Sequence, residues 1–287
     1  METISKLVEV ERKKIWMSDK ARDAHVDLKP EGIEQRRNMI YNRHHQKLDV
    51  YYPKNKPIHR VLVNIHGGGF FYGDKEIYKA YCLCLAKNGF AVINFNYRLA
   101  PEHCFPAALD DVNDLFWWLA SYIKEEKVGV IADSAGAQLA LQYMTLQTNH
   151  HYRSSFSYKK IPYVIDKVAL YCGIYFLEQS FTMTQGRLKE LRKAYLPDHI
   201  WKKYRQRLQV EQYITDALPS LFIATGQDDF LKEDTLRLHD YLKEKSISHY
   251  MKEYCSQKEA VRHVFELQPA TSISDEAMKD LMYFFNQ

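Results

Sequence analysis

One stretch of this chain constrains its fold more than any other, because it joins a buried strand to a helix through a serine. Residues 128–143 read VGVIADSAGAQLALQY. The apolar, β-branched residues at its start are typical of a buried strand, and the Ala, Gln and Leu that follow favour a helix. A tight turn between them would lift the Ser134 hydroxyl out of the sheet and aim the helix N-terminus at it. Serine is also common at ordinary helix starts, so this stretch alone leaves both interpretations open.

The rest of the chain alternates strands with helices. A hairpin is expected at 33–52, further strands at 60–65, 90–97, 167–172, 220–225 and 248–254, and helices at 75–87, 107–123, 235–245 and 275–285. Alternation of this kind places helices on both faces of a parallel sheet. The sequence therefore predicts an α/β fold with a mostly parallel central sheet.

One segment, about 174–213, breaks the alternation. Apolar residues recur at helical spacing on both sides of Pro197, which predicts a pair of helices inserted between two strands. We expect a single domain over 1–287, in which this insertion and a helix at about 1–30 form a cap. The cap would cover the sheet edge at which ligands bind in open α/β folds. Its many basic residues are expected to form a solvated helix face.

Composition excludes several classes of protein. A chain that is 46% hydrophobic can bury a sizeable core, and a net charge of +4 is too small to indicate nucleic acid as a partner. The first residues do not have the pattern of a secretory signal, and no apolar run approaches the roughly 20 residues of a membrane span. The five cysteines are odd in number and scattered. We expect a cytoplasmic protein without stable membrane insertion or structural zinc, and leave a homodimer open.

Donors for a developing oxyanion are expected in the glycine-rich turn after strand 60–65, which reads HGGG from His66 to Gly69. Three consecutive glycines let the backbone turn sharply and present its N–H groups without a side chain in the way. Glycine is scarce in this chain, with 11 residues in all, so a merely flexible turn is the weaker interpretation.

An acid and a base are also needed to activate a serine. Asp228 and Asp229 directly follow strand 220–225, at the ligand edge of the sheet, although aspartate is also a common helix N-cap. Of the histidines after Asp229, only His263 lies in a loop beyond the last strand, since His239 falls in a helix and His249 in that strand. The order serine, acid, histidine is the one found in folds of this kind.

Four motifs together resemble the hormone-sensitive-lipase-like branch of the α/β-hydrolases. They are His66–Phe70, Tyr97–His103, Phe105–Asp111 and Asp133–Gly136, and their spacing suits that family from about residue 45 to the end. The resemblance implies an esterase that acts on a small-molecule ester of short to medium acyl chain, without metal or organic cofactor. An amidase, deacetylase or peptidase with the same residues, and a non-catalytic binding protein of this fold, are the alternatives.

The resemblance also implies a role for each site residue. Ser134 would be the nucleophile, His263 the general base and acid, and an aspartate would orient His263. An ungapped match to the family's acid loop selects Asp229, and a shift by one residue would select Asp228. The resemblance further implies an oxyanion hole and a set of supporting residues. The hole would be made by the amides of Gly68, Gly69 and Ala135, and the support by His66, Gly67, Asp133 and the loop 97–103.

Two further positions depart from the family's usual pattern. The residue two before the nucleophile is usually glycine and here is Ala132, and the residue after the base is often glycine and here is Val264. A single Cβ at Ala132 should fit if the turn opens slightly, so we expect activity to be retained.

Overall fold

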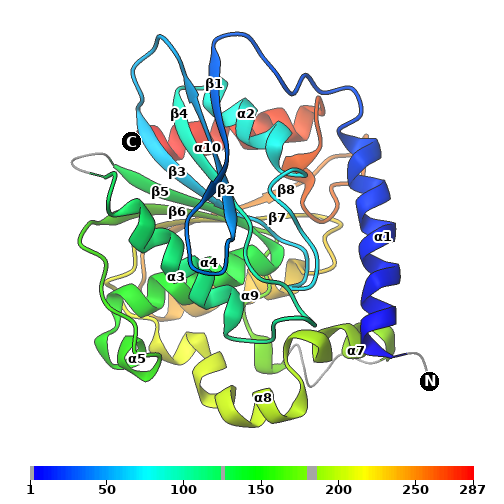
Figure 1. Cartoon of the computed structure of the whole chain (residues 1–287), viewed down its shortest axis with the longest axis vertical. Helices are drawn as coiled ribbons and strands as arrows, with labels where there is room; N and C mark the ends of the chain where they lie inside the picture. The colour runs from blue at the N-terminus through cyan, green and yellow to red at the C-terminus, as the bar shows by residue number, and fades with distance from the viewer. Residues whose placement is uncertain (1–2, 124–126, 180–185) are drawn as a thin grey trace.

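The computed structural model describes residues 3–123, 127–179 and 186–287, and their strands form one eight-stranded sheet (Figure 1). The strands are β1 (Ile33–Ile40), β2 (Lys47–Pro53), β3 (Arg60–Ile65), β4 (Phe90–Phe95), β5 (Val128–Asp133), β6 (Ile165–Tyr171), β7 (Ser220–Gly226) and β8 (His249–Tyr254). Their order is β1-β2-β4-β3-β5-β6-β7-β8. The pairs β1·β2 and β2·β4 are antiparallel, and every other pair is parallel. The predicted mostly parallel α/β sheet is confirmed.

Helices cover both faces of this sheet. They are α1 (Ile4–Arg22), α2 (Lys79–Lys87), α3 (Ala107–Leu119), α4 (Ser134–Thr148), α5 (His150–Ser155), α7 (Gly186–Tyr195), α8 (Asp198–Tyr204), α9 (Lys232–Glu244) and α10 (Ser272–Asn286). Short 3-10 helices lie at Arg205–Leu208, Val210–Tyr213 and Phe265–Leu267. Helices α2 and α10 pack on one face of the sheet, and α3, α4 and α9 pack on the other. Successive residues of one strand therefore pack into the hydrophobic cores on opposite faces of the sheet. Leu62 and Val63 of β3 are an example.

Several element boundaries differ from the sequence-based expectation. Helix α1 ends at Arg22 and not near residue 30. Helix α2 begins at Lys79 and not at residue 75, because residues 66–78 form the glycine loop and the segment that leads from it back to the helix. Helix α5 was not predicted, although Asn149 caps it by accepting the Tyr152 amide at 3.0 Å. Helices α7 and α8 lie on either side of Pro197, as the spacing predicts. Residues 180–185 of the predicted insertion lie outside the described residues.

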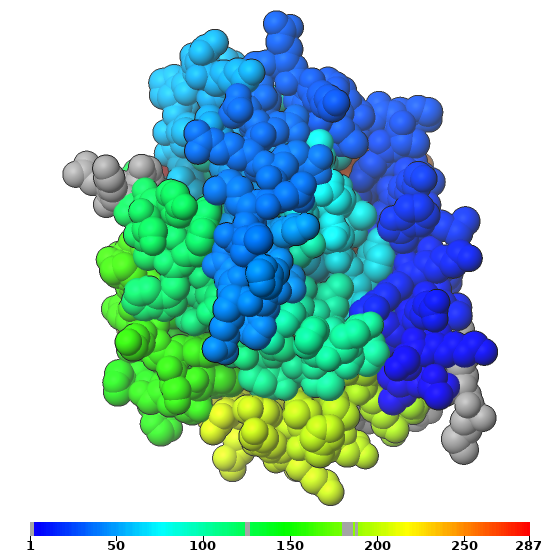
Figure 2. All heavy atoms as spheres, in the orientation of Figure 1, coloured from blue at the N-terminus to red at the C-terminus, as the bar shows by residue number. Residues whose placement is uncertain are grey.

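Helix α1 lies along one edge of the molecule, beside α7 and against the segment that follows β3 (Figures 1 and 2). Arg12 fixes it there, since its guanidinium donates to the carbonyls of Phe71 at 2.6 Å and Ala100 at 2.7 Å. The same group binds both carboxylate oxygens of Glu102, at 2.8 and 2.7 Å. A helix far away in sequence is thereby held next to the carboxyl ends of the strands.

All five cysteines are free thiols. Within the described ranges, no helix combines the length and the apolar character that crossing a membrane requires.

Candidate active site

The turn from β5 into α4 has the backbone geometry that the sequence suggested. Ser134 is the first residue of α4 and has φ +50, in the left-handed region that residues other than glycine rarely occupy. Gly136 lets the helix approach β3, because a Cβ there would lie 2.1 Å from the Ile65 carbonyl oxygen. Ala132 is buried in the core, so the turn accommodates its methyl group.

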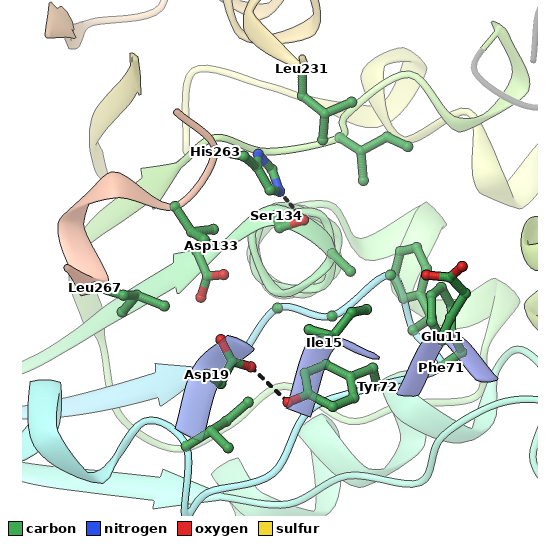
Figure 3. A pocket seen from close by; sticks show the side chains of 18 of the residues that line it. Glu11, Ile15, Asp19, Phe71, Tyr72, Asp133, Ser134, Leu231, His263 and Leu267 are labelled. Atoms are coloured by element: carbon green, nitrogen blue, oxygen red, sulfur yellow. Dashed lines mark hydrogen bonds between the residues drawn. The ribbon is translucent and has the colours of Figure 1, made fainter. Parts of the chain in front are cut away.

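Ser134, His263 and Asp229 are joined by two hydrogen bonds, although they are far apart in sequence. The Ser134 Oγ lies 2.9 Å from His263 Nε2 (Figure 3). On the other side of the ring, His263 Nδ1 lies 2.7 Å from Asp229 Oδ1. An ionised carboxylate can only accept, so His263 donates from Nδ1 and leaves the Nε2 lone pair to the serine hydroxyl. This arrangement can remove a proton from Ser134.

Two further hydrogen bonds hold the Asp229 carboxylate in place. The Leu231 amide donates to its Oδ1 at 2.9 Å, and the Thr225 hydroxyl donates to its Oδ2 at 2.9 Å. Burial alone would raise the pKa of Asp229, but the bond and the charge of His263, together with the other donors, outweigh burial and lower the pKa below its ordinary value. Asp229 is therefore ionised at neutral pH.

Asp228 binds the loop that carries His263. Its Oδ2 accepts the Val261 amide at 2.9 Å and the side-chain amide of Gln227 at 3.0 Å. Its own N–H donates to the Val261 carbonyl at 3.0 Å. Of the two adjacent aspartates, the one that touches His263 is Asp229.

The glycine loop after β3 reaches the same cavity as Ser134. Gly68 and Gly69 have φ +111 and +61, and a Cβ on Gly68 would lie 2.1 Å from the Tyr72 carbonyl oxygen, so glycine is required there. The amide of Ala135 lies in the first turn of α4 and has no acceptor within the helix. All three residues line the cavity next to Ser134. They are placed where amide donors could meet an oxyanion.

His66 supports this loop from below. It is fully buried, its ring stacks on Tyr97 with centroids 4.1 Å apart, and Nδ1 lies 2.8 Å from the Gly67 carbonyl oxygen. Burial lowers the pKa of His66 to about 4, so the imidazole is neutral and donates from Nδ1. The Tyr97 hydroxyl donates to the His66 carbonyl at 2.8 Å. These contacts fix the backbone from which the glycine loop begins.

The cavity above Ser134 has a volume of about 390 Å³, within the range of small-molecule sites. Mostly apolar residues line it, and α7 contributes Leu191. Helix α1 contributes Glu11, Ile15, Asp19 and Arg22. In Figure 3 the α1 side chains lie across the cavity from Ser134 and His263. Sequence reasoning missed these four lining residues, although their spacing along α1 marks one helix face.

Phe230 is a second lining residue that sequence reasoning missed. Its side chain is 72% exposed, and its ring centroid lies 4.3 Å from that of His263. The available sequence signal was a large aromatic residue directly after Asp229, one of the two candidate acids.

Among the described residues, only Cys172, Asp229 and His263 bring metal-ligand atoms together, all within 4.8 Å. The atoms of Asp229 and His263 that face each other are already joined by a hydrogen bond. Burial also raises the pKa of the Cys172 thiol well above its ordinary value, so the thiolate that a metal needs is disfavoured. The thiol instead forms a hydrogen bond with Asp229.

A parallel sheet with a serine on the turn after a central strand, and with an acid and a histidine on later loops, defines the α/β-hydrolase class of fold. The family model for the alpha/beta hydrolase fold matches residues 62–266. The chain belongs to this family, and its recognition from the sequence motifs is confirmed.

Similar proteins match this chain over most of its length. An acetyl esterase of Salmonella schwarzengrund (strain CVM19633) is 26% identical over 241 residues, which cover 78% of this chain and 71% of the relative. The crystal structure of esterase B from Lactobacillus rhamnosis (HN001) is 23% identical, with a TM-score of 0.88 over 99% of this chain and 94% of that one. An esterase from the bacterial hormone-sensitive lipase family is 17% identical, with a TM-score of 0.74 over 99% and 97% of the two chains.

Proposed function

We propose that this protein is a serine hydrolase that cleaves carboxylic esters of short to medium acyl chain. The observation that carries the proposal is the unbroken row of hydrogen bonds from Ser134 through His263 to Asp229, beside a small apolar cavity. The curated relatives named acetyl esterase support an ester over an amide as the substrate bond.

The reaction would run in two steps. Ser134 Oγ attacks the ester carbonyl carbon while His263 Nε2 takes its proton, and the carbonyl oxygen becomes an oxyanion. The Gly68, Gly69 and Ala135 amides then donate to that oxyanion, a set in which each donor is typically worth ~3 kcal/mol of barrier. His263 returns the proton to the leaving alcohol, which leaves an acyl group on Ser134. Water, deprotonated by His263, attacks this acyl-enzyme and releases the carboxylic acid and Ser134.

Charge placement supports these roles. The ionised Asp229 faces His263 Nδ1, so it stabilises the imidazolium that forms when Ser134 loses its proton. His66 is neutral and fully buried, and therefore acts only through the backbone that it holds.

We also propose that the whole chain is one domain with a cap. Helix α1 and helix α7 contact each other and both line the cavity, and the α1 side chains lie on the side opposite Ser134 (Figure 3). The cap would then consist of α1 and the segment from α7 to the 3-10 helix Val210–Tyr213, and would limit the length of acyl chain that fits.

Hydrolysis of p-nitrophenyl esters from acetate to octanoate tests the proposal, with Ser134→Ala as the control variant. We expect hydrolysis to be fastest for the shorter acyl chains and to be lost in Ser134→Ala. A fluorophosphonate should label the wild-type protein at Ser134 alone. Faster cleavage of a matched p-nitroanilide would indicate an amidase. Silence toward all of these esters, or labelling at another residue, would refute the proposal.

A further inference from the structure

A buried tyrosine joins the glycine loop to the serine turn. Tyr78 directly precedes α2 and is only 4% exposed. Its hydroxyl oxygen accepts the Gly67 N–H at 2.9 Å, and its O–H lies 2.8 Å from Asp133 Oδ2. Gly67 is followed directly by Gly68, and Asp133 directly by Ser134. One phenol group therefore connects the backbone that carries the proposed oxyanion donors to the backbone that carries the proposed nucleophile.

The direction of both hydrogen bonds follows from the groups involved. A backbone amide can only donate, so the Gly67 N–H must donate to the phenol oxygen. The phenol has a single hydrogen, which is then left for the Asp133 carboxylate. Burial and the charge of Asp133 raise the pKa of Tyr78 well above its ordinary value, which keeps that hydrogen in place. The Gly67 N–H therefore donates to the Tyr78 hydroxyl, and that hydroxyl donates to Asp133. We call this pair of hydrogen bonds the Tyr78 bridge.

The two segments that Tyr78 joins are in close contact. A Cβ on Gly67 would lie 2.3 Å from Asp133 Oδ2 and 3.1 Å from Ser134 Cβ. The serine segment also has a backbone conformation that is unfavourable alone, since Ser134 is not a glycine and has φ +50. Such conformations persist only when the surrounding structure holds them. Tyr78 supplies a fixed hydrogen bond to each segment at the place where they meet.

Apart from Asp133 itself, no other polar side chain of the described residues at this place binds the Gly67 N–H. The His66 ring binds the Gly67 carbonyl and not its N–H, and Tyr97 binds the His66 carbonyl. Glu266 is buried nearby, and neither of its carboxylate oxygens has a hydrogen-bond partner among the described residues. Without the phenol oxygen, the Gly67 N–H would have only the Asp133 carboxylate as an acceptor, and Asp133 Oδ2 would lose the hydrogen bond from Tyr78 in a buried place.

We propose that Tyr78 is a positioning residue, which holds the Gly68 and Gly69 amides in register with Ser134. This inference rests on the proposed ester hydrolysis. Tyr78 would act on the reaction through the loop and not by touching the reacting atoms, because both of its hydroxyl bonds are made to protein groups. Its effect should appear in the chemical step, where the oxyanion forms, and not in the binding of the ester.

The variant Tyr78→Phe removes only the hydroxyl and tests the inference. We expect kcat to fall about 10- to 100-fold, as for a small misplacement of reacting groups, while KM stays within about threefold. The affinity for a trifluoromethyl ketone, which binds as a tetrahedral adduct, should fall by the same factor as kcat/KM. The matched control is Tyr163→Phe, which removes a hydroxyl bonded to the Phe116 carbonyl at 2.8 Å, outside the cavity. It should keep wild-type kinetics.

Asp133→Ala cuts the same bridge at its other end. It should show the same fall in kcat. In the double variant of Tyr78→Phe and Asp133→Ala, kcat should fall little further, because either single change already removes the connection between the two segments. This second variant also carries the test if Tyr78→Phe does not fold.

Three outcomes would overturn the inference. The first is wild-type kcat in Tyr78→Phe, and the second is a rise in KM with unchanged kcat. The third is full additivity of the two variants. If wild type and Tyr163→Phe hydrolyse esters in these experiments, only the role of Tyr78 fails. A wild-type protein that cleaves no ester would overturn the proposed function and this inference with it.

Discussion

The adjacent aspartates provide the sharpest test of the proposed site. Asp229 Oδ1 accepts from both His263 Nδ1 and the Leu231 amide, whereas Oδ2 faces the Thr225 hydroxyl. In Asp229→Asn, the amide oxygen should therefore take the Oδ1 place and the NH₂ group should donate to Thr225. The histidine keeps its proton on Nδ1, and the variant loses only the negative charge.

The size of the effect follows from that charge. Two unit charges about 4 Å apart attract by about 4 kcal/mol at an effective dielectric constant of 20, so the imidazolium formed in the transition state is destabilised by roughly that amount. Each 1.36 kcal/mol is tenfold in rate, which gives a fall in kcat of about 1,000-fold. If the amide were turned the other way, the wrong histidine tautomer would cost about 10,000-fold.

The assay is hydrolysis of p-nitrophenyl acetate by Asp229→Asn and by Asp228→Asn, with thermal melting of both. Asp228 only holds the Val261 amide and Gln227, and an amide oxygen can accept the same bonds. Asp228→Asn should therefore lose less than about tenfold. A collapse of activity in Asp228→Asn with near-normal activity in Asp229→Asn would refute the assignment of the acid.

Two further predictions concern a buried acid and an exposed aromatic. Burial and the nearby Asp133 raise the pKa of Glu266 well above its ordinary value of 4.5. Above pH 4.5 the Glu266 carboxyl is ionised in the unfolded chain but keeps its proton in the folded protein. The free energy of unfolding therefore falls as pH rises, by up to about 1.4 kcal/mol per pH unit. Glu266→Gln should therefore gain thermal stability relative to wild type at pH 8 but not at pH 4. Phe230→Ala removes an exposed wall beside His263 and should raise KM for p-nitrophenyl butyrate about two- to tenfold, with an unchanged melting temperature.

Each of these predictions can fail clearly. Parallel melting curves of wild type and Glu266→Gln from pH 4 to pH 8 would show that the glutamate is ionised in the folded protein. A fall in kcat with an unchanged KM in Phe230→Ala would show that the ring acts on His263 and not on the ester.

The fold was largely predictable because buried parallel strands are easy to recognise in a sequence. Buried parallel strands are short apolar runs, and chemically useful residues follow them directly, so Ser134, the glycine loop and the aspartates all map to one sheet edge. The choice between Asp228 and Asp229 could not be made in this way, since it depends on how a single loop turns. In the structure, the Val261 amide binds Asp228, and Asp229 is the aspartate that binds His263.

The contacts of Tyr78 and of helix α1 could not be predicted. Tyr78 lies in the return of the glycine loop, which reads as the start of a helix from sequence alone, and its partners are fixed only when β5 lies beside β3. The apolar and charged spacing of α1 predicts a helix but not the surface on which it packs. That surface is made of loops from distant parts of the chain, and their shape is a property of the complete fold.

The place of α1 has a consequence for how the chain matures. This helix is synthesised before every group that it packs against, including the carbonyls that Arg12 binds in the loops at Phe71 and Ala100, and helix α7. Its apolar face, with Val8 fully buried in the finished protein, stays exposed to other proteins until most of the chain has left the ribosome. The part of the cavity wall that α1 forms can therefore close only after helix α7 has been synthesised.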